Sequence, residues 1–420
     1  MNKATYVIII LILNFYSCFT DVDEKIKLLE VSARDIESIL ISTDVSKYPT
    51  VKDTTDFTLM AWRGVPDEYL SIDRIIEVKD AGLNLMFYPY KSIETLKQVL
   101  DYSEIVGIKT LISCPELYTH TDSVVRLFKD HPANGGYFLE DEPGISHLER
   151  LSILSKRIEK IDNTRFTYIN FMPLNDTNNY FPAIEDYSTY LKRFATEIPL
   201  KVLSFDHYPI MLNYIRPTWY LNLEIIKKTS DELSIPFWSF AMSSAHLTYP
   251  IPNKEHFRMQ VYSNIAYGTK GIQYFTYWMP DRNPYISGPI NSKGNRTNEY
   301  YILKEINNEI QKLSHIYLSC NSYDVSFYGN VPQGTKEFSK PPYYIKSIQI
   351  KGGDALLSEM KNENNDFFMI QNINLHNEIS VKVQADTLCS IVLKSGKIIP
   401  VSLINEEIKI TPGDMVLFMR

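Results

Sequence analysis

The sequence predicts a (β/α)8 barrel followed by a C-terminal antiparallel β-sandwich. Between residues 58 and 278, eight short apolar runs recur roughly every 25–35 residues, with amphipathic stretches of helical length between them. After about residue 321 the pattern changes to short alternating segments separated by Gly and polar breaks. The 420 residues are enough for both units. We therefore expect a barrel over residues 57–320 and a sandwich over residues 321–420.

The barrel strands are expected to be near-continuous apolar runs, because both faces of a parallel barrel strand are buried. In chain order these runs are Thr58–Arg63, Leu83–Tyr90, Ile108–Cys114, Gly136–Glu142, Phe166–Met172, Val202–Tyr208, Phe237–Met242 and Gly271–Trp278. The expected helices are Ser71–Ala81, Ile93–Val106, Ser123–Lys129, His147–Ile161, Tyr187–Glu197, Tyr220–Leu233, Glu255–Tyr267 and Glu299–Ile316. Each apolar run is thus followed by one amphipathic stretch, as in a βα unit.

The C-terminal segments alternate with a period of two, which indicates strands with one buried face. They are Tyr343–Ile350, Phe367–Asn372, Ile379–Gln384, Cys389–Leu393, Ile398–Leu403, Glu407–Ile410 and Val416–Met419. No Pro/Ser-rich linker separates them from the helix that ends near Ile316. We therefore expect the sandwich to pack on the barrel and not to move as a free module.

The N-terminus is typical of an export signal. Residues 1–20 combine Lys3 with the apolar run Tyr6–Leu13, which is too short to span a bilayer comfortably. Cys18 follows a small residue, as at a lipoprotein cleavage site; plain cleavage nearby is the alternative. The chain is expected to be exported, to the periplasm or as an outer-membrane or cell-surface lipoprotein, with a lipid anchor at Cys18 as its one membrane contact. Residues 21–56 form an arm in which Lys25–Ile41 is expected to be a helix on the barrel's outside.

Composition excludes several classes of partner. The net charge is −7 and the sequence has no basic stripe, which argues against nucleic acid. The other cysteines, Cys114, Cys320 and Cys389, form no CxxC pair or Cys/His cluster, so we expect buried free thiols and not a zinc site or disulfide scaffold. We expect no metal or organic cofactor.

Chemistry in such a barrel is expected where the strands end. The fourth strand ends in Glu140-Asp141-Glu142-Pro143, and like charges this close raise one another's pKa, which is how an enzyme keeps a carboxyl protonated near neutral pH. Strand alternation predicts that Glu140 and Glu142 share one face and that Asp141 points to the other. Glu142 is the candidate general acid/base, with Glu140 and Asp141 as neighbours that tune it.

The sixth strand supplies Asp206, the expected second carboxylate. Two carboxylates that flank one point are what glycosidic bond cleavage requires. The alternative is that Asp206 orients His207 or Arg63. Other polar and aromatic side chains at the strand ends are expected to bind sugar, since aromatic faces can stack on a sugar's C–H face. These are Arg63, Tyr88, Asn170, His207, Tyr208 and Trp278.

These residues resemble glycoside hydrolase barrels of clan A. The stretch His131–Pro143 resembles the fourth-strand signature that carries the acid/base Glu, with Asp141 in place of the usual Asn. Further resemblances to bacterial proteins of the glycoside hydrolase family 42 β-galactosidase type are Phe205–Pro209, Gly268–Ile272 and Tyr274–Trp278. The resemblance implies a carboxylate mechanism, with Glu142 as acid/base.

The seventh strand departs from that pattern. Clan A places its nucleophilic Glu there, whereas Ile235–Ser244 contains no carboxylate. Asp206 or Glu140 could take the role, or the substrate could supply its own nucleophile while Asp141 holds an acetamido group, as in hexosaminidases. The sequence thus predicts an exported glycosidase acting on a poly- or oligosaccharide. The rival hypothesis is a non-catalytic glycan-binding surface lipoprotein.

Overall fold

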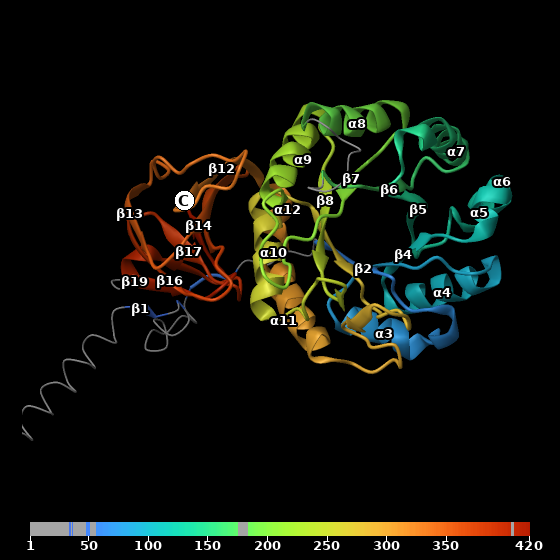
Figure 1. The fold of residues 1–420 in the computed structure, drawn as a ribbon, viewed down its shortest axis with the longest axis horizontal. Helices are drawn as coiled ribbons and strands as arrows, with labels where there is room; N and C mark the ends of the chain where they lie inside the picture. Colours follow the sequence, from blue (N-terminus) through green and yellow to red (C-terminus); the bar gives the residue numbers. More distant parts are fainter. Residues whose placement is uncertain (1–32, 35, 37–47, 51–55, 175–183, 405–406) are drawn as a thin grey trace, which may run out of the picture.

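The computed structural model describes residues 33–34, 36, 48–50, 56–174, 184–404 and 407–420. It contains a closed barrel of eight parallel strands in the order β10-β2-β3-β4-β5-β6-β7-β8 (Figure 1). The barrel strands are β2 (Thr58–Trp62), β3 (Leu85–Phe87), β4 (Lys109–Ile112), β5 (Asn134–Asp141), β6 (Thr167–Phe171), β7 (Leu203–Phe205), β8 (Phe237–Met242) and β10 (Gly271–Phe275). The predicted fold class is confirmed, and each predicted barrel strand overlaps an observed one.

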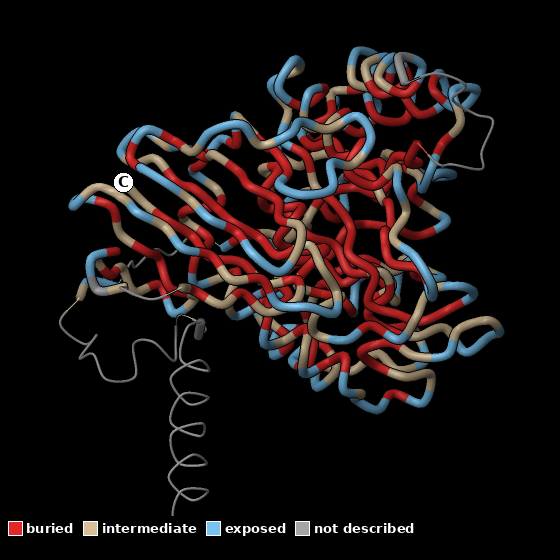
Figure 2. Tube along the Cα trace, turned by 60° about the vertical axis from the view of Figure 1, so that its left-hand side comes forward, coloured by how far each residue is buried: buried red, intermediate tan, exposed pale blue. Residues whose placement is uncertain are grey.

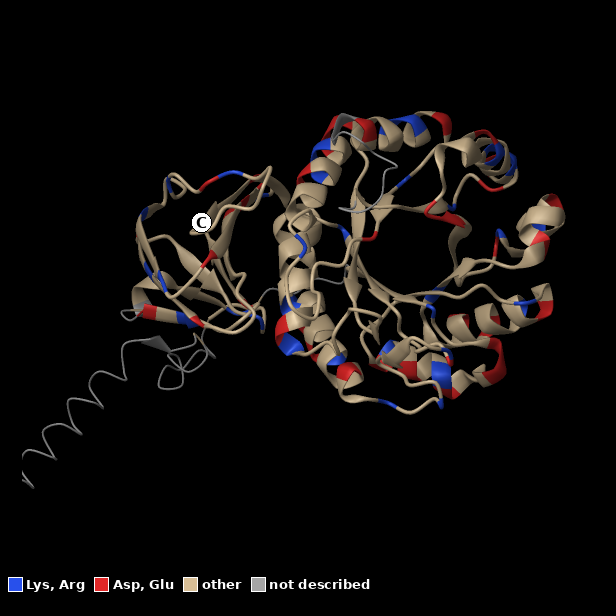
Figure 3. Cartoon of the chain, in the orientation of Figure 1, with Lys and Arg blue, Asp and Glu red and all other residues tan. Residues whose placement is uncertain are grey.

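The helices surround the barrel (Figure 1). They are α3 (Ile72–Asp80), α4 (Ile93–Val106), α5 (Pro115–Thr119), α6 (Thr121–Phe128), α7 (Leu148–Ile161), α8 (Ile184–Glu197), α9 (Trp219–Leu233), α10 (Lys254–Ala266), α11 (Asn298–Lys312) and α12 (Ser314–Ser319). Acidic and basic residues are interspersed over these helices (Figure 3).

Helix α4 illustrates how local sequence sets these elements. Ser92 caps its start by accepting a hydrogen bond from the Thr95 backbone N–H at 3.3 Å. Gly107 ends it in the left-handed conformation, with a φ of 76° that few other residues adopt. Between them, apolar side chains such as Leu96 and Leu100 bury one face against the barrel strands.

The residues of the barrel strands are mostly buried (Figure 2). Aromatic and aliphatic side chains from several of these strands pack together, so the interior is a core and not a channel. Trp62 lies in its centre, with ring centroids 4.3 Å from Phe87 and 5.1 Å from Phe240. Trp62 is 4% exposed. It therefore supports the floor of the barrel mouth from below and is not itself a sugar platform.

The C-terminal unit consists of two sheets, as predicted for a sandwich. One sheet has the order β12-β14-β15-β20-β17-β18 and the other β1-β19-β16-β13. The strands are β1 (Ala33–Arg34), β12 (Asn321–Tyr328), β13 (Ile345–Lys351), β14 (Ala355–Lys361), β15 (Asp366–Asn372), β16 (Ile379–Ala385), β17 (Ser390–Val392), β18 (Ile398–Pro400), β19 (Glu407–Ile410) and β20 (Met415–Met419). The sequence patterns did not predict β1, β12 or β14.

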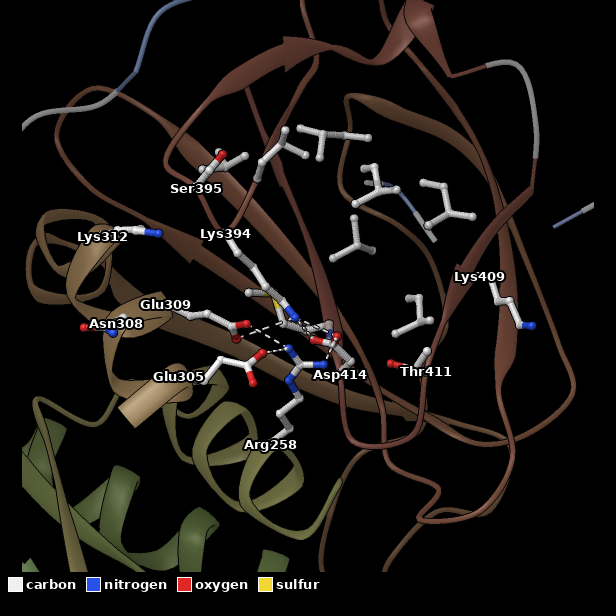
Figure 4. Close-up of a pocket in the computed structure, with 18 residues that line it drawn as sticks. Arg258, Glu305, Asn308, Glu309, Lys312, Lys394, Ser395, Lys409, Thr411 and Asp414 are labelled. Carbon is white, nitrogen blue, oxygen red and sulfur yellow. Dashed lines mark hydrogen bonds and ion pairs between the residues drawn. The ribbon is translucent and has the colours of Figure 1, made fainter. Parts of the chain in front are cut away.

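The six-stranded sheet packs directly on barrel helix α10. Side chains of both units belong to one continuous apolar core. Ser263 donates a hydrogen bond to Gln371 at 2.8 Å, and Arg258 binds Asp414 of the sandwich and Glu309 of α11, each at 2.8 Å (Figure 4). The sandwich is thus docked on the barrel, as the missing linker predicts.

The described part of the N-terminal arm differs from the prediction. Ala33–Arg34 forms strand β1 and pairs in parallel with β19, and Ile398 donates a backbone hydrogen bond to Pro49 at 3.1 Å. These residues lie along the sandwich and not on the barrel's outside, because the free edge of β19 offers backbone partners there. Most of the predicted helix, together with the export signal and Cys18, lies outside the described residues.

Two further sequence expectations concern the membrane and the thiols. Within the described ranges, the structure contains no helix that is both long and apolar enough to cross a membrane. Cys114, Cys320 and Cys389 are buried free thiols, as predicted.

Candidate active site

The end of β5 does not follow simple strand alternation. A β-bulge separates Phe138 from Glu140 in the pairing of β5 with β6, and Glu142 has a φ of 47°. The Glu142 backbone N–H still donates to Asn170 at 2.7 Å, so the chain stays attached to β6 as it turns. The bulge shifts the side chains relative to a regular strand. As a result, Asp141 and Glu142 both face the barrel mouth, and the predicted pairing of Glu140 with Glu142 is wrong.

Glu140 points away from this mouth. Its carboxylate binds His147 Nδ1 at 2.7 Å and forms an ion pair with Arg150 of α7. These partners belong to the helical layer that follows β5. The structure therefore removes Glu140 from the candidate nucleophiles, because its charge is already paired outside the mouth.

Asn170 joins the two aspartates. Its side-chain Nδ2 lies 3.0 Å from Asp141 Oδ1 and 2.9 Å from Asp206 Oδ1. An amide group carries two N–H donors, so each carboxylate can take one. Because Asn170 lies on β6, between β5 and β7, it holds the carboxylates of both neighbouring strands in one place.

A buried hydrogen-bond chain fixes Asn170 in turn. Ser204 donates to Asn170 Oδ1 at 3.1 Å, and Gln273 Nε2 donates to Ser204 at 2.7 Å. Tyr168 lies 2.6 Å from Ser204 and donates to Gln273. The sequence analysis did not identify Tyr168, Ser204 or Gln273. The signal was available, because each is a polar group in the middle of an otherwise apolar barrel strand.

The three carboxyl groups at the mouth perturb one another. Burial raises the pKa of Asp206 well above its ordinary value, and the charges of Glu142 and Asp141 raise it further. Partial burial of their carboxyl groups also raises the pKa of Glu142 and of Asp141, although both residues reach the solvent at the mouth. The carboxyls of Glu142 and Asp206 are within hydrogen-bonding reach of each other. Such a pair can share one proton.

Arg63 and Tyr88 form another part of the rim. The Arg63 guanidinium lies 5.7 Å from the centre of the Tyr88 ring. Arg63 follows β2, and the strand order places β2 opposite β6 and Asn170. The structure thus places these two residues across the mouth from the carboxylates, where a ligand held by both would span the opening.

His207 and Tyr208 have different environments. His207 is 2% exposed, its Nε2 lies 3.1 Å from Thr218 Oγ1, and burial lowers its pKa to about 3. It is a neutral wall residue and not an accessible ligand contact. Tyr208 packs among the aromatic side chains of the interior, and the nearby charge of Asp206 adds to burial in raising its pKa. Tyr208 therefore lies beside the carboxylates.

The side chain of Trp278 does not face the mouth. It is 3% exposed and packs against the Tyr69 ring, with 4.7 Å between the centroids, while the Arg74 guanidinium covers it at 5.4 Å. Its backbone N–H donates to the Arg63 carbonyl at 3.0 Å, but its ring turns away and is covered by Tyr69 and Arg74. The predicted role of Trp278 as a sugar platform is wrong.

The position after β8 carries serines and no carboxylate. Ser243 and Ser244 are fully buried and donate hydrogen bonds to the backbone of Thr276 and Phe275, each at 3.2 Å. Within the described ranges, no group of three or more His, Cys, Asp or Glu side chains is arranged to hold a metal ion. At this mouth the structure brings together carboxyl groups and their hydrogen-bond partners.

Comparison with solved structures identifies the architecture. A β-galactosidase from Bacillus circulans sp. alkalophilus aligns over 89% of this chain and 99% of its own, with a TM-score of 0.61 and 9% identity. A catalytic mutant of a family 42 β-galactosidase from G. stearothermophilus aligns over the same shares, with a TM-score of 0.59 and 10% identity. The chain thus has the same overall fold as these β-galactosidases.

A family 5 glycoside hydrolase from Bacteroides vulgatus has the same fold. It aligns over 86% of this chain and 88% of its own, with a TM-score of 0.54 and 12% identity. The chain spans 60% of the length of a β-galactosidase from Marinomonas ef1. No protein-family model and no curated protein matches the sequence. At these identities, the comparisons establish the fold alone.

Proposed function

We propose that the protein is an exported glycoside hydrolase in which Glu142 is the general acid/base and Asp206 the second carboxylate. One observation carries the proposal: Asn170 holds Asp141 and Asp206 through one side-chain nitrogen, with Glu142 in reach of Asp206. This cluster lies at the C-terminal ends of β5, β6 and β7, where barrels of this fold carry their chemistry.

The shared proton suits the first step of glycoside cleavage. In the free protein, burial favours the neutral form of Asp206, and its proton can pass across their hydrogen bond to Glu142. When the glycosidic oxygen reaches Glu142, the proton passes to that oxygen and the bond to the anomeric carbon breaks. Asp206 is then a carboxylate, which either bonds to the anomeric carbon or activates water against it. The leaving group departs as an alcohol, so charge is balanced.

Asp141 has an alternative role that the geometry keeps open. It is adjacent to Glu142 and is held by Asn170, so it could position the acetamido group of an N-acetylated sugar. The acetamido oxygen would then act as the nucleophile, while Glu142 stays the acid. This version needs no second attacking carboxylate.

The rival proposal is a glycan-binding surface protein whose barrel does not catalyse. The buried Ser243 and Ser244 after β8 favour it, because clan A enzymes place a nucleophilic Glu on that strand. The raised carboxyl pKa values favour catalysis, since a purely structural site gains nothing from like charges held together.

A panel of nitrophenyl glycosides and polysaccharides tests the proposal. The wild type should release nitrophenol or reducing sugar from at least one member. Glu142→Gln and Asp206→Asn should each reduce the rate by about 10²–10⁴-fold, the usual worth of acid–base assistance. Glu140→Gln is the matched control and should lose less than about tenfold, because Glu140 pairs with His147 outside the mouth. A wild type that binds polysaccharide and cleaves nothing would establish the rival.

Export and lipidation of Cys18 belong to the same proposal. The small residue before Cys18, at the end of the apolar run Tyr6–Leu13, supports them. Mass spectrometry of the mature protein should find a lipidated N-terminal Cys18, and Cys18→Ala should give a soluble protein in the periplasm or medium. A mature N-terminus at another residue would contradict lipidation.

A further inference from the structure

A cavity lies between the barrel and the sandwich. Its volume is about 680 Å³, within the range of small-ligand sites. One side is formed by residues 210–217, which follow β7, together with Pro250 and His256. The other side is formed by the sandwich residues 330–332, 354 and 373–376. The cavity therefore needs both units.

This cavity is connected to the candidate active site through aromatic side chains. Tyr208 lies two residues after Asp206 and packs against Tyr249, with 5.9 Å between the ring centroids. The Arg216 guanidinium, which lines the cavity, lies 5.4 Å from the centre of the Tyr249 ring. The charge of Asp206 reaches Tyr249, since it adds to burial in raising the pKa of that tyrosine. Tyr249 thus bridges the carboxylates and the cavity.

Exposed apolar side chains gather at this cavity. Tyr214 is 57% exposed and Leu212 61% exposed, and both line it. Ile251, on the neighbouring loop after β8, is 57% exposed. Grouped exposure of large apolar side chains marks a binding surface, whereas single ones do not.

The polar lining suits a ligand rich in hydroxyl groups. Asn213, Arg216 and His376 offer planar donors and acceptors around Tyr214. The Asp354 carboxylate is already satisfied, because it accepts two hydrogen bonds from Asn330 at 2.9 Å each. An aromatic side chain together with planar polar side chains in one cavity is the chemistry that recognises a sugar ring.

The loop that carries Tyr214 is held in place. Met211 donates a backbone hydrogen bond to Tyr214 at 2.9 Å, and Arg216 donates one to Pro209 at 2.8 Å. Leu212 bonds to Thr248 of the next loop at 3.0 Å. A loop fixed by three backbone bonds loses little entropy when it binds a ligand.

We propose that this cavity is a carbohydrate-binding subsite, and that the substrate is an extended oligo- or polysaccharide that runs from the carboxylates, past Tyr249, to Tyr214. The inference rests on the proposed glycosidase function and deepens it: the sandwich contributes directly to substrate binding. Saccharides long enough to reach Tyr214 gain contacts that a single sugar with an aryl leaving group cannot make.

Affinity electrophoresis in gels that contain soluble polysaccharides tests binding without any need for hydrolysis. The probes are galactan, arabinogalactan, xyloglucan, glucomannan and laminarin. At least one should retard the wild type, and Tyr214→Ala should weaken that retardation about tenfold in dissociation constant. His376→Ala tests the sandwich side and should weaken it in the same direction. Tyr301→Ala is the matched control, since Tyr301 is equally exposed at 57% but lies on α11.

Kinetics give the second measurement. The ratio of kcat/KM on the retarding polysaccharide to kcat/KM on a nitrophenyl glycoside should fall about tenfold in Tyr214→Ala and hold its wild-type value in Tyr301→Ala. Equal retardation of the wild type and Tyr214→Ala overturns the subsite and leaves the glycosidase proposal standing. A wild type that no probe retards also overturns the subsite. Release of nitrophenol by that protein would then preserve the proposed function, and its absence would remove both.

Discussion

Asn170 Nδ2 lies 2.9 Å from Asp206 Oδ1, and this contact places a neutral donor against the most perturbed carboxyl of the mouth. The hydrogen bond lowers the pKa of Asp206, whereas burial and the neighbouring carboxylates raise it. Asn170 is therefore a positioning residue that limits how strongly Asp206 holds its proton.

Replacing Asn170 with Ala should move the pH dependence of activity. Without its amide, the pKa values of Asp141 and Asp206 rise further, so the acidic limb of the kcat profile should shift to higher pH. We expect kcat to fall about 10- to 100-fold at neutral pH, since a hydrogen bond to a charged group contributes about 1.5–3 kcal/mol. Asn84→Ala removes an amide that bonds backbone groups near the other end of β2 and should leave the limb in place. If the acidic limb of the kcat profile stays at its wild-type pH in Asn170→Ala, the role of Asn170 is merely structural.

The two carboxylates should differ in how their loss affects substrates. Glu142→Ala should spare glycosides with very good leaving groups, such as dinitrophenol, because these need no proton. Asp206→Ala should reduce the rate on all glycosides alike, and azide should restore activity if a covalent intermediate forms. Near-full activity of Asp206→Ala combined with an inactive Asp141→Asn would transfer the second role to Asp141 and favour the substrate-assisted mechanism.

The product should retain its anomeric configuration. Retaining enzymes hold their carboxyl groups about 5–5.5 Å apart, and inverting enzymes about 6.5–9.5 Å apart. Glu142 and Asp206 are within hydrogen-bonding reach, so the retaining separation requires the smaller movement on substrate entry. Proton NMR of the first sugar released gives the anomer directly, and an inverted product would contradict the assignment of Asp206 as nucleophile.

Asp206→Asn should stabilise the fold at neutral pH. Folding raises the pKa of Asp206, so the folded chain prefers its neutral form, and the ionised form becomes a cost as pH rises above the ordinary Asp range near ~3.9. The variant should therefore have a higher Tm than the wild type at pH 7–8, and the difference should vanish at about pH 4 and below, where Asp206 is protonated in both states. Asp122→Asn, which loses a surface ion pair with Arg157, should show no gain. A lower Tm for Asp206→Asn than for the wild type at pH 8 would contradict the inference that burying Asp206 destabilises the fold.

The barrel could be predicted from the sequence because its signal is local. Each βα unit carries its own apolar run and amphipathic helix, and the helix Ile93–Val106 was predicted to the residue. Strand β1 could not be predicted in this way, since two residues form it only by pairing with β19, far along the chain. Non-local pairing leaves no periodic signal.

Part of the candidate site could also be predicted from local sequence. Strand ends brought Asp141, Asn170 and Asp206 together because parallel strands finish at one rim. The orientation of Glu140 depended on the β-bulge, which alternation does not reveal, although Gly135-Gly136 in the strand was a hint of irregular backbone. Trp278 was misplaced because its ring packs against Tyr69 and Arg74, contacts between distant parts of the chain that the sequence pattern does not show.

The ion cluster between the two units should be important for stability. Arg258 is 12% exposed at its side chain and binds Asp414 of the sandwich and Glu309 of α11, while Lys394 also binds Asp414 at 2.6 Å (Figure 4). In Arg258→Ala, the partly buried carboxylates of Glu309 and Asp414 lose the guanidinium that neutralises them. Breaking one side of a buried ion pair costs about 3–5 kcal/mol.

We therefore expect Arg258→Ala to lower the urea midpoint of unfolding clearly, with the barrel and sandwich still unfolding together because they share one core. Lys254→Ala is the matched control: Lys254 pairs with Glu305 on the exposed side of the same cluster, and its loss should cost no more than about 1 kcal/mol. Equal midpoints for the two variants would show that the cluster is no stronger than a surface ion pair. Two separated transitions in Arg258→Ala would show that this cluster, and not the shared apolar core, couples the sandwich to the barrel.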